Sequence, residues 1–283
     1  MARTYTTALT LSAVAAVAAV ATVTANAESI TSVPIRLHGT EAPVVTIRVQ
    51  GQELHLQLDL GDASSIVLHP EVLRSLHSEP TADTFSAFGM DGKIETPIVS
   101  LDLVEVGDVK MFGVAARADV HDDSFRDYKK SEIGAVGFVG MGLFKSGQLV
   151  VDYSRKRLQI SQPQESGAPR NVCRGQPVPL VANSTWGLTT SVSTDVGELL
   201  FVWDTGSPAI VMSRSSATAV HVAADADNTV FKKFVLGRRN YGPQRIDIWD
   251  IPTPMGMAGL IGHPFFQKHV VCIDSPGLRL FIQ

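Results

Sequence analysis

The chain has 283 residues, 45% of them hydrophobic, which is enough for two domains of ordinary size, each with a buried core. Lys and Arg number 24 against 28 Asp and Glu, and the formal net charge of −4 excludes the basic surface expected of a nucleic-acid-binding protein. The eight histidines and two cysteines show no zinc-binding spacing, so we expect neither a metal nor any other cofactor.

The N-terminus has the pattern of a secretory signal peptide over residues 1–27. Arg3 provides a basic start, residues 8–23 are uncharged and rich in Ala and Val, and residues 25–27 (Ala-Asn-Ala) match a small-x-small cleavage site. An uncleaved anchor helix is the alternative, but the stretch is short and only weakly apolar. We therefore expect a mature protein that begins near Glu28, is periplasmic or secreted, and has no membrane association after signal cleavage.

In the first half, two apolar stretches at residues 44–50 and 53–60 flank Gly51 and predict a strand-turn-strand unit. The second stretch runs into the segment Leu58-Asp59-Leu60-Gly61-Asp62. The remaining elements expected in this half are, in chain order, a short helix at 70–76, a long hairpin at 85–98, an apolar glycine-containing strand at 137–142, a short helix at 143–146, and closing strands at 149–152 and 157–160.

Residues 163–179 are polar at first, contain prolines and lack periodicity, which is typical of a linker. Beyond them, strands expected at 188–192 and 199–203 lead into the segment Trp203-Asp204-Thr205-Gly206-Ser207. The elements expected after it are a hairpin at 236–242, an apolar glycine-containing strand at 259–262, a short helix at 265–268, and closing strands at 271–274 and 279–282.

The two halves share one pattern. Residues 137–144 align with residues 259–266, and the closing strands align without a gap at the same offset of 122 positions, which relates Gly140 to Gly262. Asp59 and Asp204 lie 145 positions apart, so the first half carries 23 additional residues between its Asp and its glycine strand. This register indicates a duplicated unit, in which each of two similar lobes can deliver one carboxylate to a shared cleft.

These residues resemble the aspartic protease superfamily, in its two-lobed pepsin-like and bacterial retropepsin-like forms. The resemblance extends from about Val33 to the C-terminus. It implies an all-β fold with short helices, namely a two-lobed double β-barrel with an N-terminal lobe at 28–162, a linker at 163–179 and a C-terminal lobe at 180–283. In this family the two Asp loops face each other across a pseudo-two-fold axis, and an extended peptide lies in the cleft under a hairpin flap. Fused lobes imply a monomer.

The resemblance implies an aspartic-type endopeptidase that acts on a peptide or unfolded protein, with Asp59 and Asp204 as catalytic residues. Metal-free amide hydrolysis requires a base for the water and an acid for the tetrahedral intermediate, and two carboxylates held close divide these roles because both cannot ionise. Thr205 would hydrogen-bond across to the opposite loop, and Ser207 would bond the outer carboxylate oxygen. Gly61 and Gly206 would allow each loop to turn tightly.

The first loop departs from the family pattern at two positions. Leu60 stands where the family has Thr or Ser, and Asp62 stands where a small residue or a hydroxyl is usual. Asp62 would raise the pKa of a catalytic carboxyl if it faced inward, or it could point to solvent or cap the helix at Pro70. Two readings stay open: an active endopeptidase with a shifted pH profile, or a catalytically impaired protease-fold protein that binds peptides.

Cys173 and Cys272 are the two cysteines of the chain. An oxidising compartment permits a disulfide between them, which would tie the start of the second lobe to its penultimate strand. The alternative is two separate thiols, with Cys272 acting as a small core residue.

Overall fold

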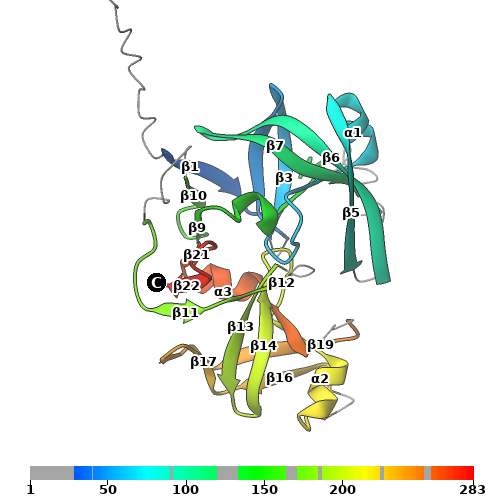
Figure 1. Ribbon diagram of the computed structural model, residues 1–283. Helices are drawn as coiled ribbons and strands as arrows, with labels where there is room; N and C mark the ends of the chain where they lie inside the picture. Colours follow the sequence, from blue (N-terminus) through cyan, green and yellow to red (C-terminus); the bar gives the residue numbers. More distant parts are fainter. Residues whose placement is uncertain are drawn as a thin grey trace, which may run out of the picture.

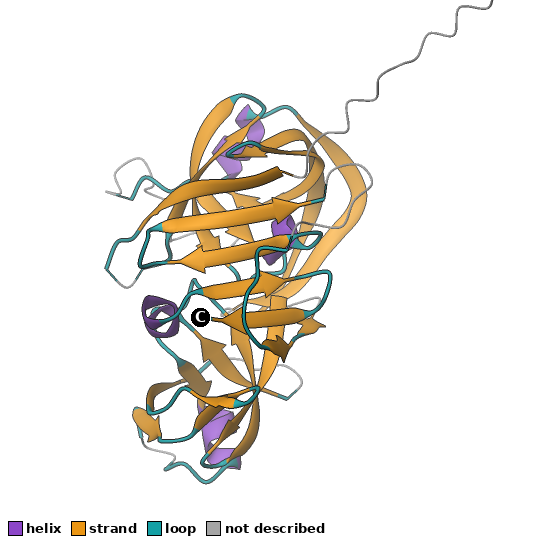
Figure 2. Ribbon diagram, turned by 90° about the vertical axis from the view of Figure 1, so that its left-hand side faces the viewer, coloured by secondary structure: helices purple, strands orange, loops and turns teal. Residues whose placement is uncertain are grey.

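The computed structural model describes residues 29–39, 41–89, 92–119, 133–163, 171–183, 187–223, 226–251 and 256–283. The expected signal peptide and residues 90 and 91, at the tip of the expected long hairpin, lie outside this part of the chain. Strands dominate the described residues, and the helices are short (Figure 2). Among the described residues, a 13-stranded sheet builds the first lobe and extends into the second, a 9-stranded sheet builds the rest of the second lobe, and the two lobes are stacked (Figure 1).

The first lobe is built on the β2–β3 hairpin, whose turn at Gln50 and Gly51 has positive φ angles at both residues. Along β3, Leu54, Leu56 and Leu58 are buried and the intervening residues are not, as the period of two requires. The elements of this lobe are β1 (Ser29–Arg36), β2 (Val44–Val49), β3 (Gln52–Asp59), β4 (Ile66–Leu68), α1 (Pro70–Ser75), β5 (Ser78–Gly89), β6 (Gly92–Val106), β7 (Val109–Ala118), β8 (Gly137–Gly140), η1 (Met141–Phe144), β9 (Gln148–Asp152) and β10 (Arg157–Gln162).

The second lobe repeats this order with shorter strands. Its central hairpin, β13–β14, delivers Asp204 as β3 delivers Asp59. The elements are β11 (Pro177–Pro179), β12 (Val181–Asn183), β13 (Gly187–Thr194), β14 (Gly197–Trp203), β15 (Val211–Ser213), α2 (Arg214–Ala219), β16 (Asn228–Phe231), β17 (Phe234–Leu236), β18 (Arg239–Asn240), β19 (Gln244–Trp249), β20 (Met257–Ile261), α3 (His263–Lys268), β21 (Val271–Asp274) and β22 (Arg279–Ile282).

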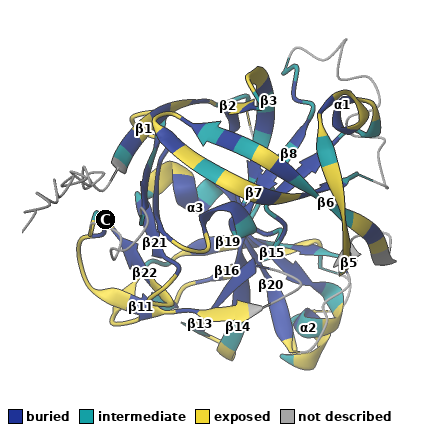
Figure 3. Ribbon diagram, turned by 45° about the horizontal axis from the view of Figure 1, so that its top comes forward, coloured by how far each residue is buried: buried dark blue, intermediate teal, exposed yellow. Residues whose placement is uncertain are grey.

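A sheet shared by the two lobes joins them. Strand β9 of the first half pairs antiparallel with β21 of the second, and Val150 lies opposite Cys272. These two residues are repeat counterparts at the offset of 122, so the pseudo-two-fold axis passes between them. A two-fold contact between like elements is the interface expected of a duplicated unit. Figure 3 shows β20 and β21 buried along their lengths, whereas β7 and β11 carry exposed residues.

The short helix after each glycine strand closes the core of its lobe. Met141, Leu143 and Phe144 of η1 are buried in the first lobe. In the second lobe, Phe265 and Phe266 of α3 meet the buried Trp203 edge-on, with ring centroids 5.4 and 5.9 Å apart. The helix expected at residues 143–146 is thus a 3-10 turn that begins two residues earlier. Helix α2 was not predicted at all.

The hairpin at residues 236–242 occupies a different place from the one expected. Its place after the second Asp loop would make it the counterpart of the long hairpin expected at 85–98, but its turn at Gly237 packs against Val178 of β11. In the first lobe the turn at Gly107, between β6 and β7, packs in the same way against Val33 of β1. The counterpart of residues 236–242 is therefore this β6–β7 turn, because both turns cover the first strand of their own lobe.

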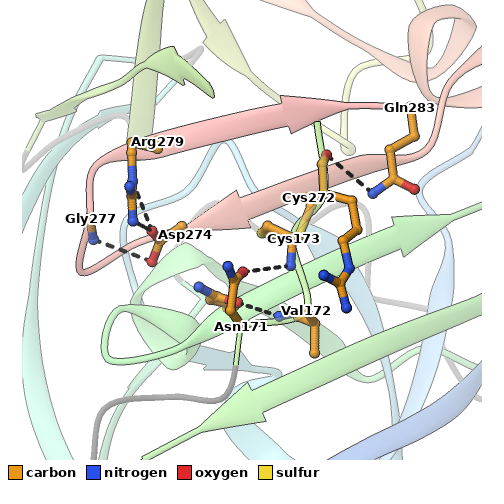
Figure 4. Close-up of a disulfide and its surroundings, with 10 residues drawn as sticks. Asn171, Val172, Cys173, Cys272, Asp274, Gly277, Arg279 and Gln283 are labelled. Atoms are coloured by element: carbon orange, nitrogen blue, oxygen red, sulfur yellow. Dashed lines mark hydrogen bonds and ion pairs between the residues drawn. A yellow bond between two sulfur atoms is a disulfide. The ribbon is translucent and has the colours of Figure 1, made fainter. Parts of the chain in front are cut away.

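Cys173 and Cys272 form a disulfide between the expected linker and β21 (Figure 4). The Asn171 side-chain oxygen accepts a hydrogen bond from the Cys173 N–H at 3.1 Å, which fixes the approach of the segment. Residues 177–179 of the expected linker form β11 and pair with β22. Among the residues described above, no helix combines the length and apolar character needed to cross a bilayer.

Loss of this disulfide is expected to destabilise the protein. The bridge closes a segment with a sequence separation of 99 residues. In the chain-entropy model such a cross-link contributes about 4 to 5 kcal/mol. Urea unfolding of the Cys173→Ala/Cys272→Ala variant should therefore show a midpoint well below that of the wild type, and reducing agent should lower only the wild-type midpoint. Equal midpoints for the oxidised wild type and the variant would contradict a structural role for the disulfide.

Candidate active site

Asp59 and Asp204 stand at equivalent points of the two lobes. Each follows a buried central strand that pairs in parallel with a glycine strand: Asp59 lies opposite Gly140, and the Asp204 N–H donates to the Ile261 carbonyl at 3.0 Å. Each then begins the same turn, in which the N–H of Asp62 donates to the Asp59 carbonyl and that of Ser207 to the Asp204 carbonyl, both at 3.3 Å. The two loops therefore have one backbone conformation.

Two glycines allow a strand to pass close behind each loop. A Cβ atom at Gly140 would lie 2.4 Å from the Ser64 carbonyl oxygen, and one at Gly262 would lie 2.1 Å from the Ala209 carbonyl oxygen. Both distances are far below van der Waals contact, so no other residue fits at either position without moving the loop. Gly140 and Gly262, which the repeat register relates, thus make the same close approach in the two lobes.

The two loops meet at the pseudo-two-fold axis, and each packs its glycine against the carboxyl group of the other. A Cβ atom at Gly61 would lie 2.6 Å from Cγ of Asp204, and one at Gly206 would lie 2.9 Å from Cγ of Asp59. This reciprocal contact brings the two carboxyl groups together. The residues predicted from the two Asp-x-Gly segments thus form one site, although 145 positions separate them.

Thr205 joins the loops by two hydrogen bonds. Its hydroxyl donates to the Leu58 carbonyl at 2.6 Å and accepts from the Leu60 N–H at 3.1 Å, and the side chain is fully buried. Leu60 occupies the equivalent position of the first loop and is buried at 1% exposure in the apolar core. The cross-loop contact is therefore made by a hydroxyl from one side only.

Backbone N–H groups surround each carboxyl unequally. Asp59 Oδ1 accepts from the Gly61 N–H at 3.0 Å, whereas Asp204 Oδ1 accepts from the N–H groups of both Gly206 and Ser207, at 2.7 and 3.1 Å. The role expected for the Ser207 hydroxyl is not observed, because this hydroxyl donates to the Ala209 carbonyl at 2.9 Å. Backbone N–H groups bind the Asp204 carboxylate in its place. The turn is tight enough for the hydroxyl to reach the carbonyl two residues ahead.

The protein environment raises the pKa of both carboxyl groups. For Asp59 the main cause is burial, followed by the negative charges of Asp204 and Asp62, and together they raise its pKa well above the ordinary value. Burial also raises the pKa of Asp204, but hydrogen bonds from Asp59 and from two backbone N–H groups oppose this effect. The pair therefore shares a proton, with Asp59 its principal holder. Both residues keep some solvent-exposed surface.

Of the three roles expected of Asp62, one is observed: its charge raises the pKa values of Asp59 and Asp204. It does not cap α1, because the ring of His69 accepts the N–H at the start of that helix. Nor does it point freely to solvent: its Oδ1 accepts from the Ser64 N–H at 2.5 Å, and its Oδ2 lies 3.1 Å from the guanidinium of Arg117 on β7. The third acid of the site is thus held in an ion pair.

Arg117 was missed by sequence reasoning. Its side chain is only 4% exposed, and its Nε donates to the Ser64 hydroxyl at 3.0 Å. The guanidinium lies 4.6 Å from the ring centroid of Phe85 and 5.7 Å from that of Phe138. A spacing of 55 residues between Asp62 and Arg117 follows no periodic pattern, so the sequence did not link the two residues. The one local sign was a charged residue among Ala115, Ala116 and Ala118 of β7.

Tyr153 is a second polar group near the dyad that the sequence did not reveal. It is buried, packs against the ring of His263 with centroids 5.0 Å apart, and its pKa is raised by burial and by the charge of Asp204. Within the described part of the chain, His, Cys, Asp and Glu side chains form no cluster that could hold a metal ion.

Comparisons with known proteins support the architecture. No protein-family model matches the sequence, and no curated protein matches it. Among solved structures, the chain is similar to the aspartic proteinase from Irpex lacteus, with a TM-score of 0.58 and 14% identity over 90% of this chain and 97% of that one. At this identity the likeness shows the fold alone. The chain has the two-lobed pepsin-like fold, which confirms the predicted fold class.

The raised pKa values predict an unusual pH dependence of stability. The folded-state pKa of each carboxyl lies above its unfolded value, so the native state binds more protons than the unfolded state between those two pH values. The free energy of unfolding therefore falls as pH rises from about 4 through the folded pKa values. Asp204→Asn removes one group and relieves Asp59. Urea unfolding should show this variant more stable than wild type at neutral pH, with the difference fading toward pH 4. A pH-independent difference would contradict the assignment.

Proposed function

We propose that the protein is an aspartic-type endopeptidase that hydrolyses peptide bonds with a water activated between Asp59 and Asp204. The observation that carries this proposal is the reciprocal contact of each loop glycine with the opposite carboxyl group. It brings two acids with raised pKa values together at a partly solvent-exposed point between two lobes. The pepsin-like fold supports the proposal, since it is the architecture of the Irpex lacteus aspartic proteinase.

The environments of the two acids support a division of catalytic roles. Asp204 accepts two backbone N–H bonds, which favour its ionised form, so its carboxylate takes a proton from the water. The water oxygen then attacks the carbonyl carbon of the peptide bond. Asp59, whose pKa is raised most, gives its proton to the carbonyl oxygen, and collapse of the tetrahedral intermediate passes a proton to the amine that leaves.

The substrate class and location follow from the same proposal. A pair of acids that is partly exposed between two β-lobes suits an extended peptide or an unfolded protein, whose backbone can lie along strand edges. We propose that the protein acts in the periplasm or after secretion and is a monomer, because one chain supplies both Asp loops. The Cys173–Cys272 disulfide supports export, since such bridges persist in oxidising compartments.

The direct test is hydrolysis of denatured casein from about pH 3 to pH 7, with and without a statine-type inhibitor. The wild type should cleave, the inhibitor should block cleavage, and Asp204→Asn should lower the rate by a factor of about 1,000 or more while the protein stays folded. Asp102→Asn, which changes an exposed carboxylate on β6, is the matched control and should cleave normally. Cleavage by Asp204→Asn at the wild-type rate would refute the proposal.

A second candidate function, peptide binding without catalysis, is favoured by one observation: Leu60 provides no hydroxyl to the cross-loop contact. Leu60→Thr distinguishes the two. If Thr205 alone suffices to hold the loops, Leu60→Thr should change the rate of casein cleavage less than about threefold and lower the free energy of unfolding by about 1 to 3 kcal/mol, because it places a hydroxyl in an apolar core. A wild type that binds peptide without turnover, and gains turnover with Leu60→Thr, would favour the binding protein.

A further inference from the structure

The two Asp loops carry different side chains at several equivalent positions. Gly140 lies against the carbonyls of Asp62 and Ser64, and its counterpart Gly262 lies against those of Ser207 and Ala209. The first loop therefore has an acid and a hydroxyl where the second has Ser207 and Ala209. These backbone contacts identify the equivalent positions of the two loops. The loops therefore share a backbone arrangement and differ in their side chains.

The strand that covers each loop differs as well. Gly137 lies against the carbonyl of Val67, which pairs with Arg117 of β7; the counterpart Gly259 lies against the carbonyl of Val211, which pairs with Asp247 of β19. The Arg117 side chain hydrogen-bonds to Asp62 and Ser64. In the second lobe, Asp247 instead pairs at 3.0 Å with Arg245 of the same strand, and the Arg245 side chain is 69% exposed. A buried loop-to-strand ion pair thus occurs in the first lobe, and an exposed pair within one strand takes its place in the second.

We propose that Arg117 is a positioning residue: it clamps Asp62 and Ser64 of the first loop to β7 and, through the Asp62 charge, sets the pH range in which the Asp59–Asp204 pair shares one proton. This inference deepens the proposed peptidase function and rests on it for its catalytic consequence. The electrostatic part of it concerns the pair of carboxyl groups alone, whether or not they hydrolyse peptides.

The contacts of Arg117 suit a clamp better than a general stabiliser. A buried ion pair loses much of its attraction to desolvation, so stability alone is a weak reason for it. Here the guanidinium is fixed by two donors in different directions, one to Ser64 and one to Asp62, and its planar face lies against Phe85 of the β5–β6 hairpin. The planar fork of an Arg permits this arrangement, which a Lys ammonium cannot reproduce.

The sign of the electrostatic effect follows from the charges present. The Asp62 carboxylate raises the pKa of both Asp59 and Asp204, and the Arg117 guanidinium, 3.1 Å from Asp62, offsets that charge. Among the described side chains, the other charged groups on the adjacent strands are Glu79 and Asp83 of β5, Glu95, Asp102 and Glu105 of β6 and Lys110 of β7, with Asp119 after β7; Glu105 and Asp119 are half-buried and the rest are exposed. Tyr153, which packs against His263, is neutral from about pH 3 to pH 7, since burial raises its pKa above an ordinary value that already lies near 10.

Opposite shifts from two substitutions test the inference. Arg117→Met leaves the Asp62 charge uncompensated and should raise the apparent pKa values of the dyad by about 0.5 to 1 unit. Asp62→Asn removes the charge and should lower them by a similar amount, and the double variant should fall between. The measurement is a carbon-13 NMR titration of the Asp59 and Asp204 carboxyl groups, which needs no peptidase activity. The acid-to-neutral limb of the casein pH profile should move in the same directions.

The controls separate a clamp from a loss of fold. Arg245→Met removes the Arg of the ion pair at the equivalent strand of the second lobe and should leave the dyad titration unchanged. Arg117→Lys keeps the charge but not the fork, so it should shift the titration less than Arg117→Met; it serves as the test if Arg117→Met does not fold. Shifts of the same sign in Arg117→Met and Asp62→Asn, or no shift in either, would overturn the inference. NMR shifts without casein cleavage would refute the peptidase function and leave the electrostatic role intact.

Discussion

The structure depends on one contact: each Asp loop places its glycine against the carboxyl group of the other loop. That contact is possible only if two lobes present the same loop to each other across a two-fold axis, and the β9–β21 pairing of Val150 with its counterpart Cys272 supplies the axis. The glycine strands behind the loops and the Thr205 hydroxyl between them hold the geometry. The remaining secondary structure forms the two cores on which these elements rest.

Much of this arrangement could be predicted from the sequence because a repeat constrains it twice. An Asp-x-Gly loop and an apolar glycine strand, seen once, fit many turns; seen twice at fixed offsets, they require two similar lobes and one shared site. Elements with a weak local signal were harder to predict. Strand β1 was not predicted because a proline, Pro34, is unusual inside a strand, although the buried residues Thr31, Val33 and Ile35 alternate regularly. Helix α2 is a short Ser-rich segment whose signal was the Ser213 cap that accepts the Ser216 N–H.

Residues that break the repeat could not be interpreted from the sequence. Asp62 was recognised as a departure that could raise a catalytic pKa, but its ion pair with the buried Arg117, on a strand 55 positions away, was not foreseen. The Ser207 hydroxyl was given a role that the tight turn assigns to backbone N–H groups instead. In both cases local spacing identified the residue, and long-range packing decided which atom it contacts. The two carboxyls are consequently in unequal surroundings: two backbone N–H groups donate to Asp204 and one donates to Asp59.

The central claim is that the Asp59 and Asp204 carboxyl groups meet and share one proton. A high-resolution crystal structure of the protein at mildly acidic pH tests it most directly, because the separation of the two inner carboxyl oxygens can be measured without any assay. The account predicts a hydrogen-bonding separation of about 3 Å or less, with the Thr205 hydroxyl between Leu58 and Leu60. Carboxyl groups separated by more than about 6 Å, too far for a shared proton, would contradict it.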